Sequence, residues 1–217
     1  MKRILLTGFE PFQQETINPS WEAVKQLDSQ IIGHYEVMAR RLPTAFYPAK
    51  SQIQTYLQEL HPEVVICVGQ AGGRPDITLE RIAINLIDAR IPDNDGVSPI
   101  DVPIEADGPA AYWTNLPIKA MRSAIQGAGV PCSISYSAGT YVCNSTFYAL
   151  MHAIESFGQS CRGGFIHIPF LPQQATAHVG KASMSLDDMV RGLHAAIAAV
   201  DDEEIVHVSA GTLHHEQ

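Results

Sequence analysis

The chain has 217 residues, of which 46% are apolar and 17% charged, and its formal net charge is -9 at pH 7. The acidic balance excludes nucleic acid and anionic membrane surfaces as expected partners, because neither is attracted by an acidic protein. No apolar run approaches the length of a membrane span, and the polar opening does not fit a signal peptide, so we expect a cytoplasmic protein.

The length suits one well-buried core, and we predict a single domain over residues 1–217 with a mobile tail at about 208–217. The charged fraction lies below the roughly 25% usual for soluble proteins, so we expect some apolar surface to be covered in an oligomer. The four cysteines show no CxxC pair and no metal-ligand spacing. Reduced thiols and no metal site are therefore expected.

Strands and helices alternate in the first part of the chain. Apolar periodicity predicts strands over 3–7, 35–41 and 64–68, separated by helices over 21–27 and 46–60. Asn18 and Pro19 fit the N-cap and the first helical residue of the first helix. This order predicts an α/β fold with a mostly parallel sheet and helices on its faces.

Two phenylalanines, Phe9 and Phe12, follow the first predicted strand. They fit ordinary core residues and equally fit one wall of an apolar pocket. In parallel sheets, ligands bind at the loops that follow the carboxyl ends of the strands. The residues alone leave both interpretations open.

A glycine-rich loop at 69–74 follows the strand at 64–68, but no Gly-Lys-Ser/Thr follows it, so phosphate binding is disfavoured. Residues 77–87 alternate as a further strand. A carboxylate such as Glu80 on its apolar face needs an imidazole or guanidinium partner if it is buried, or water at an edge. That face would carry Thr78, Glu80, Ile82 and Ile84.

The segment 88–114 is rich in Pro, Gly and Asp and is predicted to be irregular. Such segments are active-site lids, interface arms or plain surface loops, and the sequence does not choose among them. A helix over 116–126 and a strand over 133–136 follow.

Cys143 precedes a helix predicted over 146–157, with Asn144 and Ser145 as the expected caps. Unpaired N–H groups and the helix dipole at such a position favour a thiolate and can hold an oxyanion. A buried, inert cysteine at a strand-to-helix turn is the competing interpretation. The other cysteines lack such surroundings.

His167 lies near the end of a strand predicted over 164–169. A histidine among apolar neighbours is usually a packed residue, so this position alone does not assign catalysis. Ser183 and Ser185, with Asp188 three residues after the second, predict a capping box that opens the last helix.

Two long stretches carry a resemblance to the pyroglutamyl peptidase I (pyrrolidone-carboxylate peptidase) family of cysteine peptidases. They are GQAGGRPDITLERIAIN at 69–85 and VPCSISYSAGTYVCN at 130–144. Shorter family-like segments are found at 8–12, 88–94, 167–169 and 183–186. The resemblance implies a single-domain α/β/α sandwich, frequent assembly as a homotetramer and no cofactor.

The family resemblance also implies an activity and residue roles. The expected reaction is hydrolysis of the amide bond after an N-terminal pyroglutamate through a thioester, so the expected partners are N-terminally pyroglutamylated peptides. The implied catalytic residues are Cys143, His167 and Glu80, and Arg90 is implied as support for the oxyanion. The implied substrate-binding residues are Phe9, Phe12, Asn18, Gln70, Ile91, Tyr141 and Val142.

Two alternatives stay open, and one of them follows from a departure from the family pattern. Gln13 and Gln14 stand where family members commonly carry glycines, which reduces the backbone freedom of the loop beside the pocket. A non-catalytic protein that binds 5-oxoproline is therefore one alternative. A nucleoside phosphorylase, which has a similar sandwich but needs phosphate and no thiol, is the other.

Overall fold

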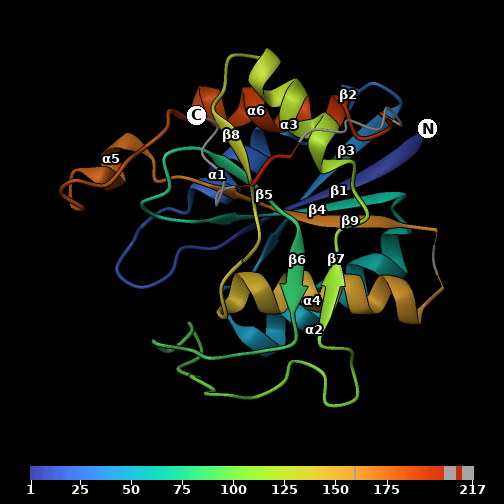
Figure 1. Cartoon of the computed structure of the whole chain (residues 1–217), viewed down its shortest axis with the longest axis vertical. Coiled ribbons are helices and arrows are strands. Elements are labelled where there is room, and N and C mark those ends of the chain that lie inside the picture. The colour runs from blue at the N-terminus through green and yellow to red at the C-terminus, as the bar shows by residue number, and fades with distance from the viewer. Residues whose placement is uncertain (159, 203–208, 212–217) are drawn as a thin grey trace.

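The computed structural model describes residues 1–158, 160–202 and 209–211 and is built around a seven-stranded sheet (Figure 1). The strands run in the order β2-β3-β1-β4-β9-β5-β8. The mobile tail expected at about 208–217 lies outside the described residues, apart from positions 209–211. The strands are β1 (Lys2–Phe9), β2 (Ile31–Ile32), β3 (Tyr35–Leu42), β4 (Val64–Gln70), β5 (Ile77–Glu80), β8 (Cys132–Ser135) and β9 (Arg162–Ile168).

Most neighbours in this sheet are parallel. β1 pairs in parallel with β3 and β4, β4 with β9, and β5 with β8, whereas β2 with β3 and β5 with β9 are antiparallel. The parallel strands β1, β4 and β9 therefore end at the same edge of the sheet. The predicted mostly parallel mixed sheet is confirmed.

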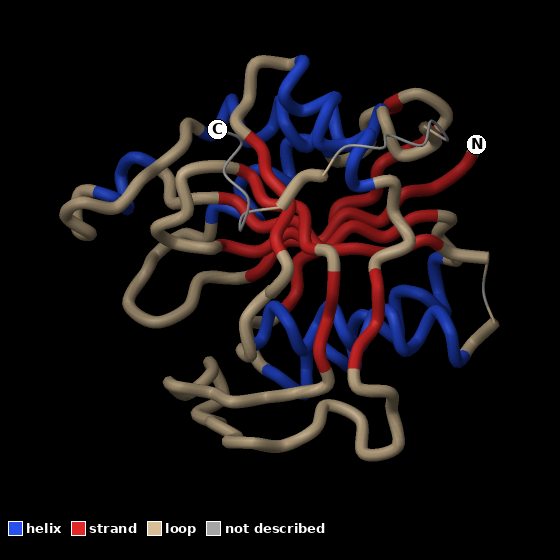
Figure 2. Tube along the Cα trace, viewed as in Figure 1, coloured by secondary structure: helices blue, strands red, loops and turns tan. Residues whose placement is uncertain are grey.

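Helices cover both faces of the sheet, as Figures 1 and 2 show. Ile4 and Leu6 of β1 point into one core and Leu5 into the other, because successive strand residues face opposite sides. α1 (Pro19–Val24), η1 (Lys25–Leu27), α3 (Ile118–Gly127) and α6 (Leu186–Ala198) pack on the first face, and α2 (Phe46–Leu60) and α4 (Val142–Ser156) pack on the second. This arrangement confirms the predicted α/β/α sandwich.

Two predicted helix starts are confirmed. Oδ1 of Asn18 accepts from the N–H of Ser20 at 3.0 Å at the start of α1, with Pro19 as the first helical residue. Oγ of Ser185 accepts from the N–H of Asp188 at 3.1 Å at the start of α6. The short helix α5 (Pro172–Ala175) lies between β9 and α6.

The strand predicted over 77–87 is wrong in its second half. β5 ends at Glu80, and β6 (Ile82–Ile84) pairs with β7 (Ala111–Trp113) in a separate two-stranded sheet. The break falls at Arg81, whose N–H still donates to the last residue of β8 before the chain leaves the main sheet. Of the residues predicted to share a sheet face with Glu80, Thr78 lies with it in β5, whereas Ile82 and Ile84 lie in the other sheet.

The segment predicted to be irregular over 88–114 contains β7, which the prediction missed because three residues are too few for an alternating pattern. Polar side chains hold the rest of the segment in place. Asn85 Oδ1 accepts from the N–H groups of residues 104 and 105, and Asp93 Oδ2 accepts from the N–H of Phe46 at 2.9 Å. The segment is thereby fixed to the start of α2. In the described part of the chain, no helix has the length and apolar character needed to cross a membrane.

Candidate active site

Glu80 and His167 meet where β5 and β9 run antiparallel. Nδ1 of His167 lies 2.7 Å from Oε1 of Glu80, and the two residues are only 3% and 0% exposed. They are separated by 87 residues in the sequence, so no local pattern connects them. Glu80 is therefore buried and has an imidazole partner, one of the two kinds of partner predicted for a buried carboxylate at this position.

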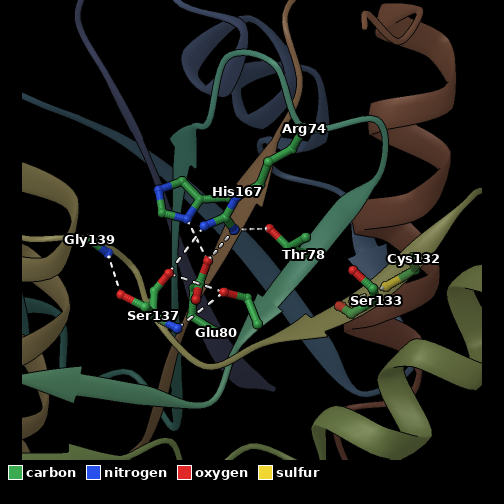
Figure 3. A network of polar contacts seen from close by, with 9 residues as sticks. Arg74, Thr78, Glu80, Cys132, Ser133, Ser137, Gly139 and His167 are labelled. Atoms are coloured by element: carbon green, nitrogen blue, oxygen red, sulfur yellow. Dashed lines mark hydrogen bonds and ion pairs between the residues drawn. The ribbon is translucent and has the colours of Figure 1, made fainter. Parts of the chain in front are cut away.

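Arg74, in the loop between β4 and β5, is a second partner of the same carboxylate (Figure 3). Its Nη1 donates to Oε1 of Glu80 at 2.6 Å and to Oγ1 of Thr78 at 2.5 Å. Its Nη2 donates to the carbonyl of Ser137 at 3.1 Å. Sequence reasoning anticipated a guanidinium as one kind of partner for Glu80, but it assigned no role to Arg74.

Burial by itself raises the pKa of Glu80, but its partners reverse the direction. The hydrogen bond and the charge of His167 lower the pKa, and the Ser135 hydroxyl and Arg74 add to the lowering, so the net value lies below the ordinary 4.5. Glu80 is therefore a carboxylate near neutral pH. A carboxylate at Nδ1 keeps the proton on that nitrogen and leaves Nε2 of His167 to accept another.

Cys143 is the second residue of α4, which begins four residues earlier than predicted. The N-cap, Tyr141, makes no side-chain capping bond, and the first bond of the helix runs from the N–H of Ser145 to the carbonyl of Tyr141 at 3.0 Å. The N–H groups before Ser145 therefore lack partners within the helix and are placed to stabilise an anion.

The predicted capping role of Asn144 and Ser145 is wrong, because both lie buried inside α4. Asn144 instead holds β6 and the residues after it against the helix. Its Oδ1 accepts from the N–H of Ile84 at 3.0 Å, and its Nδ2 donates to the carbonyls of Ile84 and Leu86 at 2.9 and 3.1 Å. Short polar side chains are as suited to such bonds as to caps, so the sequence did not distinguish the two uses.

The thiol of Cys143 packs against the end of β4, where glycine leaves room for it. A Cβ atom on Gly69 would lie 2.9 Å from Sγ. Burial, and then the charge of Glu80, raises the pKa of the Cys143 thiol to about 12, while Arg74 and a backbone hydrogen bond at Cys143 lower it by less. The backbone effect has the predicted sign but burial outweighs it, so the half-buried Cys143 is a neutral thiol until a base takes its proton.

A cavity of about 530 Å³ reaches the N-cap of α4. Five of the predicted site residues line it, namely Phe12, Gln70, Arg90, Ile91 and Tyr141. The remaining lining residues are Gln13, Glu15, Gly72, Asp88, Thr140, Phe170 and His178. The cavity is thus bordered by the loops after β1 and β4, the irregular segment and the turn before Cys143.

Three other predicted pocket residues are buried and are not part of this lining. Phe9 is 2% exposed, with its ring centroid 6.3 Å from that of Phe165, and Val142 is fully buried. Asn18 uses its side chain within the protein, because Nδ2 donates to the carbonyl of Glu10 at 3.0 Å while Oδ1 caps α1. Their roles toward a substrate stay predictions.

The sequence profile of the pyroglutamyl peptidase family matches residues 2–203. This chain belongs to the pyroglutamyl peptidase family. A pyrrolidone-carboxylate peptidase from Bacillus cereus (strain Q1) is 49% identical over 215 residues, which cover 99% of this chain and 100% of the relative. The predicted membership and the predicted enzyme class, a cysteine peptidase, are therefore confirmed.

Solved structures of the family have the same fold. Pyroglutamyl peptidase I from Bacillus amyloliquefaciens is 48% identical with a TM-score of 0.90, and the match covers 92% of this chain and 97% of that one. The pyrrolidone carboxyl peptidase from Thermococcus litoralis is 42% identical with a TM-score of 0.89, over 93% of this chain and 94% of that one.

Sequence reasoning missed three residues at the rim of the cavity of this family member. Nε2 of His178 lies 2.9 Å from Oε1 of Glu15, and the ring of His178 stacks on that of Phe170 with centroids 4.5 Å apart. No motif signalled this group, because 163 residues separate Glu15 from His178.

Gln13, which departs from the family pattern of glycines, has a φ of 57°, in the left-handed region that favours glycine.

Proposed function

We propose that this cysteine peptidase removes an N-terminal pyroglutamate from peptides and that Cys143, His167 and Glu80 carry out the chemistry. The observation that carries the proposal is the buried bond of 2.7 Å between His167 and Glu80 in a chain of the pyroglutamyl peptidase family. Nucleophilic acyl transfer requires a carboxylate that orients an imidazole and a thiol within its reach. The Cys143 thiol packs at Gly69, which is the strand partner of His167 across β4 and β9, and this register supports the proposal.

In the proposed mechanism, Nε2 of His167 takes the proton of Cys143 as Sγ attacks the carbonyl carbon that follows the lactam ring. The N–H groups at the start of α4, with Arg90, stabilise the resulting oxyanion. The C–N bond then breaks, the amine takes the proton from His167, and a thioester remains. Water adds to the thioester carbonyl with His167 as base, and the thiol leaves with the proton. Glu80 stabilises the imidazolium that forms in each step.

The cavity residues support an uncharged lactam as the group that is bound. Pyroglutamate has no free amine, so its recognition needs apolar walls and a few amide hydrogen bonds rather than a carboxylate. Phe12, Ile91 and Tyr141 offer the walls, and Gln70 offers an amide. Phe9 and Val142 are proposed as further walls and Asn18 as a further polar contact, although all three are buried outside the cavity lining.

We further propose a single-domain protein that acts in the cytoplasm as a homo-oligomer, with the tetramer as the expected form. The low charged fraction supports an assembly, and so do large apolar side chains at the surface of the described structure. Ile100 and Trp113 are 65% and 64% exposed, for example. Light scattering coupled to size exclusion would measure the mass of the assembly.

Release of a fluorophore from a pyroglutamyl amide by the wild type and by Cys143→Ser tests the function. We expect cleavage by the wild type and loss of at least about 10³-fold in the variant, because a serine hydroxyl is a far weaker nucleophile here than a thiolate. Alanyl and prolyl amides should not be cleaved by either protein.

Cys161→Ala is the matched control, because Cys161 is buried at the opposite end of β9 from His167. Iodoacetamide should inactivate this control as it does the wild type. Undiminished activity in Cys143→Ser would remove Cys143 from the mechanism, and an inactive wild type would overturn the proposed activity itself.

A further inference from the structure

The guanidinium of Arg74 lies between the carboxylate of the site and the turn that leads to the nucleophile (Figure 3). One nitrogen donates to Glu80 and Thr78, which lie on the same face of β5. The other nitrogen donates to the carbonyl of Ser137, in the turn between β8 and α4. Arg74 thus connects β5 to this turn, whose Ser137 lies 63 residues after Arg74 in the sequence.

Oε1 of Glu80 accepts from both Arg74 and His167, at 2.6 and 2.7 Å. Two donors converging on one oxygen fix both its distance and its direction relative to the imidazole. Oε2 of Glu80 is buried and has no hydrogen-bond partner among the described residues. The orientation of the carboxylate therefore depends on what holds Oε1.

The surroundings of Glu80 show why a fixed cation is needed there. The titratable and polar groups that face it are His167 from β9, Arg74 from the β4–β5 loop, Cys143 from α4 and the Ser135 hydroxyl from β8. Arg74 is the member of this group that is always charged. Its charge stabilises the buried Glu80 carboxylate at every stage of the reaction, including the stages in which His167 is neutral.

We propose that Arg74 is a positioning residue of the triad, which holds the Glu80 carboxylate in the orientation that His167 requires and joins it to the turn before Cys143. This inference rests on the proposed function and adds a residue to it. Arg74 acts through Glu80 and does not touch the substrate. Its loss should therefore reduce kcat and leave KM nearly unchanged.

The alternative is that Arg74 only stabilises the fold, as ion pairs often do. The test compares Arg74→Met, which keeps an unbranched apolar stem without the charge, with Arg74→Lys, which keeps the charge without the planar fork. Arg191→Met is the matched control, because Arg191 forms an exposed ion pair with Asp188 on α6.

We expect Arg74→Met to lower kcat by about 10²-fold, the loss typical of a small misplacement of a catalytic group, with KM within about threefold of the wild type. The acid limb of the kcat/KM profile should move to higher pH, because Glu80 protonates more readily without the cation. Arg74→Lys should restore part of kcat and return the acid limb toward its wild-type position. Arg191→Met should leave kcat, KM and the acid limb unchanged.

The rate of alkylation of Cys143 by iodoacetamide provides a readout that needs no substrate. It should fall in Arg74→Met with the same shift of the acid limb, even if the wild type fails to cleave pyroglutamyl amides, so the two proposals can fail separately. An Arg74→Met variant that is folded by circular dichroism and has an unchanged acid limb and alkylation rate would overturn the positioning role.

Discussion

Glu80 shows how burial and specific partners compete at a single carboxyl group. The residue is 0% exposed, and burial alone would favour its neutral form, yet its bond to His167 keeps it ionised. The same bond couples the charge of Glu80 to the proton that His167 carries during the reaction. One residue therefore contributes both to the reaction and to the pH dependence of folding.

The variant Glu80→Gln separates the charge of this residue from its shape. The amide fills the same space but does not stabilise an imidazolium, so we expect kcat to fall by about 10²–10⁴-fold, within the range that follows from disturbing a triad carboxylate. KM should stay close to the wild-type value, because Glu80 lies outside the cavity lining. Steady-state kinetics would check both parameters, and a kcat within fivefold of the wild type would contradict the assigned role.

The same variant tests the direction of the pKa shift. The folded-state pKa of Glu80 lies below its ordinary value of 4.5, so its contribution to stability is present above about pH 4.5 and is lost as the pH falls through the lowered folded-state pKa. Acidification should therefore reduce the stability of the wild type relative to Glu80→Gln. Urea unfolding of both proteins between pH 7 and pH 3 would measure this change, and parallel pH curves would contradict it.

At the scale of elements, the position of the nucleophile depends on how α4 is joined to β6. Asn144 is fully buried and makes three hydrogen bonds to the backbone of Ile84 and Leu86. These bonds fix the start of α4 to β6. Glu80 lies at the end of β5, the strand before β6. The segment that carries the nucleophile is therefore linked to the strand that carries the carboxylate through β6, which begins two residues after Glu80.

The variant Asn144→Ala should lower the free energy of unfolding by about 2–4 kcal/mol, because it leaves buried backbone groups without partners. Asn94→Ala is the control, since Asn94 is exposed and bonds to Glu10 and the carbonyl of Pro11 at the surface. We expect a loss below about 1 kcal/mol for the control. Equal urea midpoints for the two variants would show that the bonds of Asn144 carry no particular weight.

Elements with a clear period could be predicted from the sequence. The apolar stripe over 46–60 coincides with α2, and the cap at Asn18 coincides with the start of α1. The break after Glu80 could not be predicted, because the alternation continues through Arg81 while the hydrogen-bond partners change from the main sheet to β7. Local patterns report which residues are apolar, but they do not report with which strand a segment pairs.

In the site, too, local features could be predicted from the sequence, whereas contacts that depend on the fold could not. Cys143 and the need of Glu80 for a partner were visible in local sequence, and the resemblance to the family linked them to His167. Arg74 and the contact between Glu15 and His178 were not assigned, because side chains that meet only through the fold leave no periodic signal. A motif indicates which residues take part in the chemistry, whereas the contacts that position them depend on the tertiary structure.

At the scale of the whole molecule, the site and a second polar network lie at opposite ends of the parallel strands. His167 is near the carboxyl end of β9, and Arg162 is its first residue. Nη1 of Arg162 donates to the carbonyl of Val200 at 2.6 Å, and its Nη2 donates to the Tyr35 hydroxyl and to Asp201 at 2.9 and 2.5 Å. This network joins β9 and β3 to the segment after α6, far from the cavity.

This separation predicts that a substitution in the Arg162 network lowers the stability of the fold without lowering the activity. The variant Arg162→Ala removes three bonds to a partly exposed cation, and we expect a loss of about 1–3 kcal/mol and a decrease in Tm of a few degrees. The kcat and KM measured well below Tm should stay within twofold of the wild type. Lys2→Ala is the control, because Lys2 contacts the same Asp201 only at 3.8 Å with about half of its side chain exposed, so its Tm should change little. A fall in kcat that accompanied the fall in Tm for Arg162→Ala would show instead that the two ends of the sheet are coupled, since β9 contributes to both.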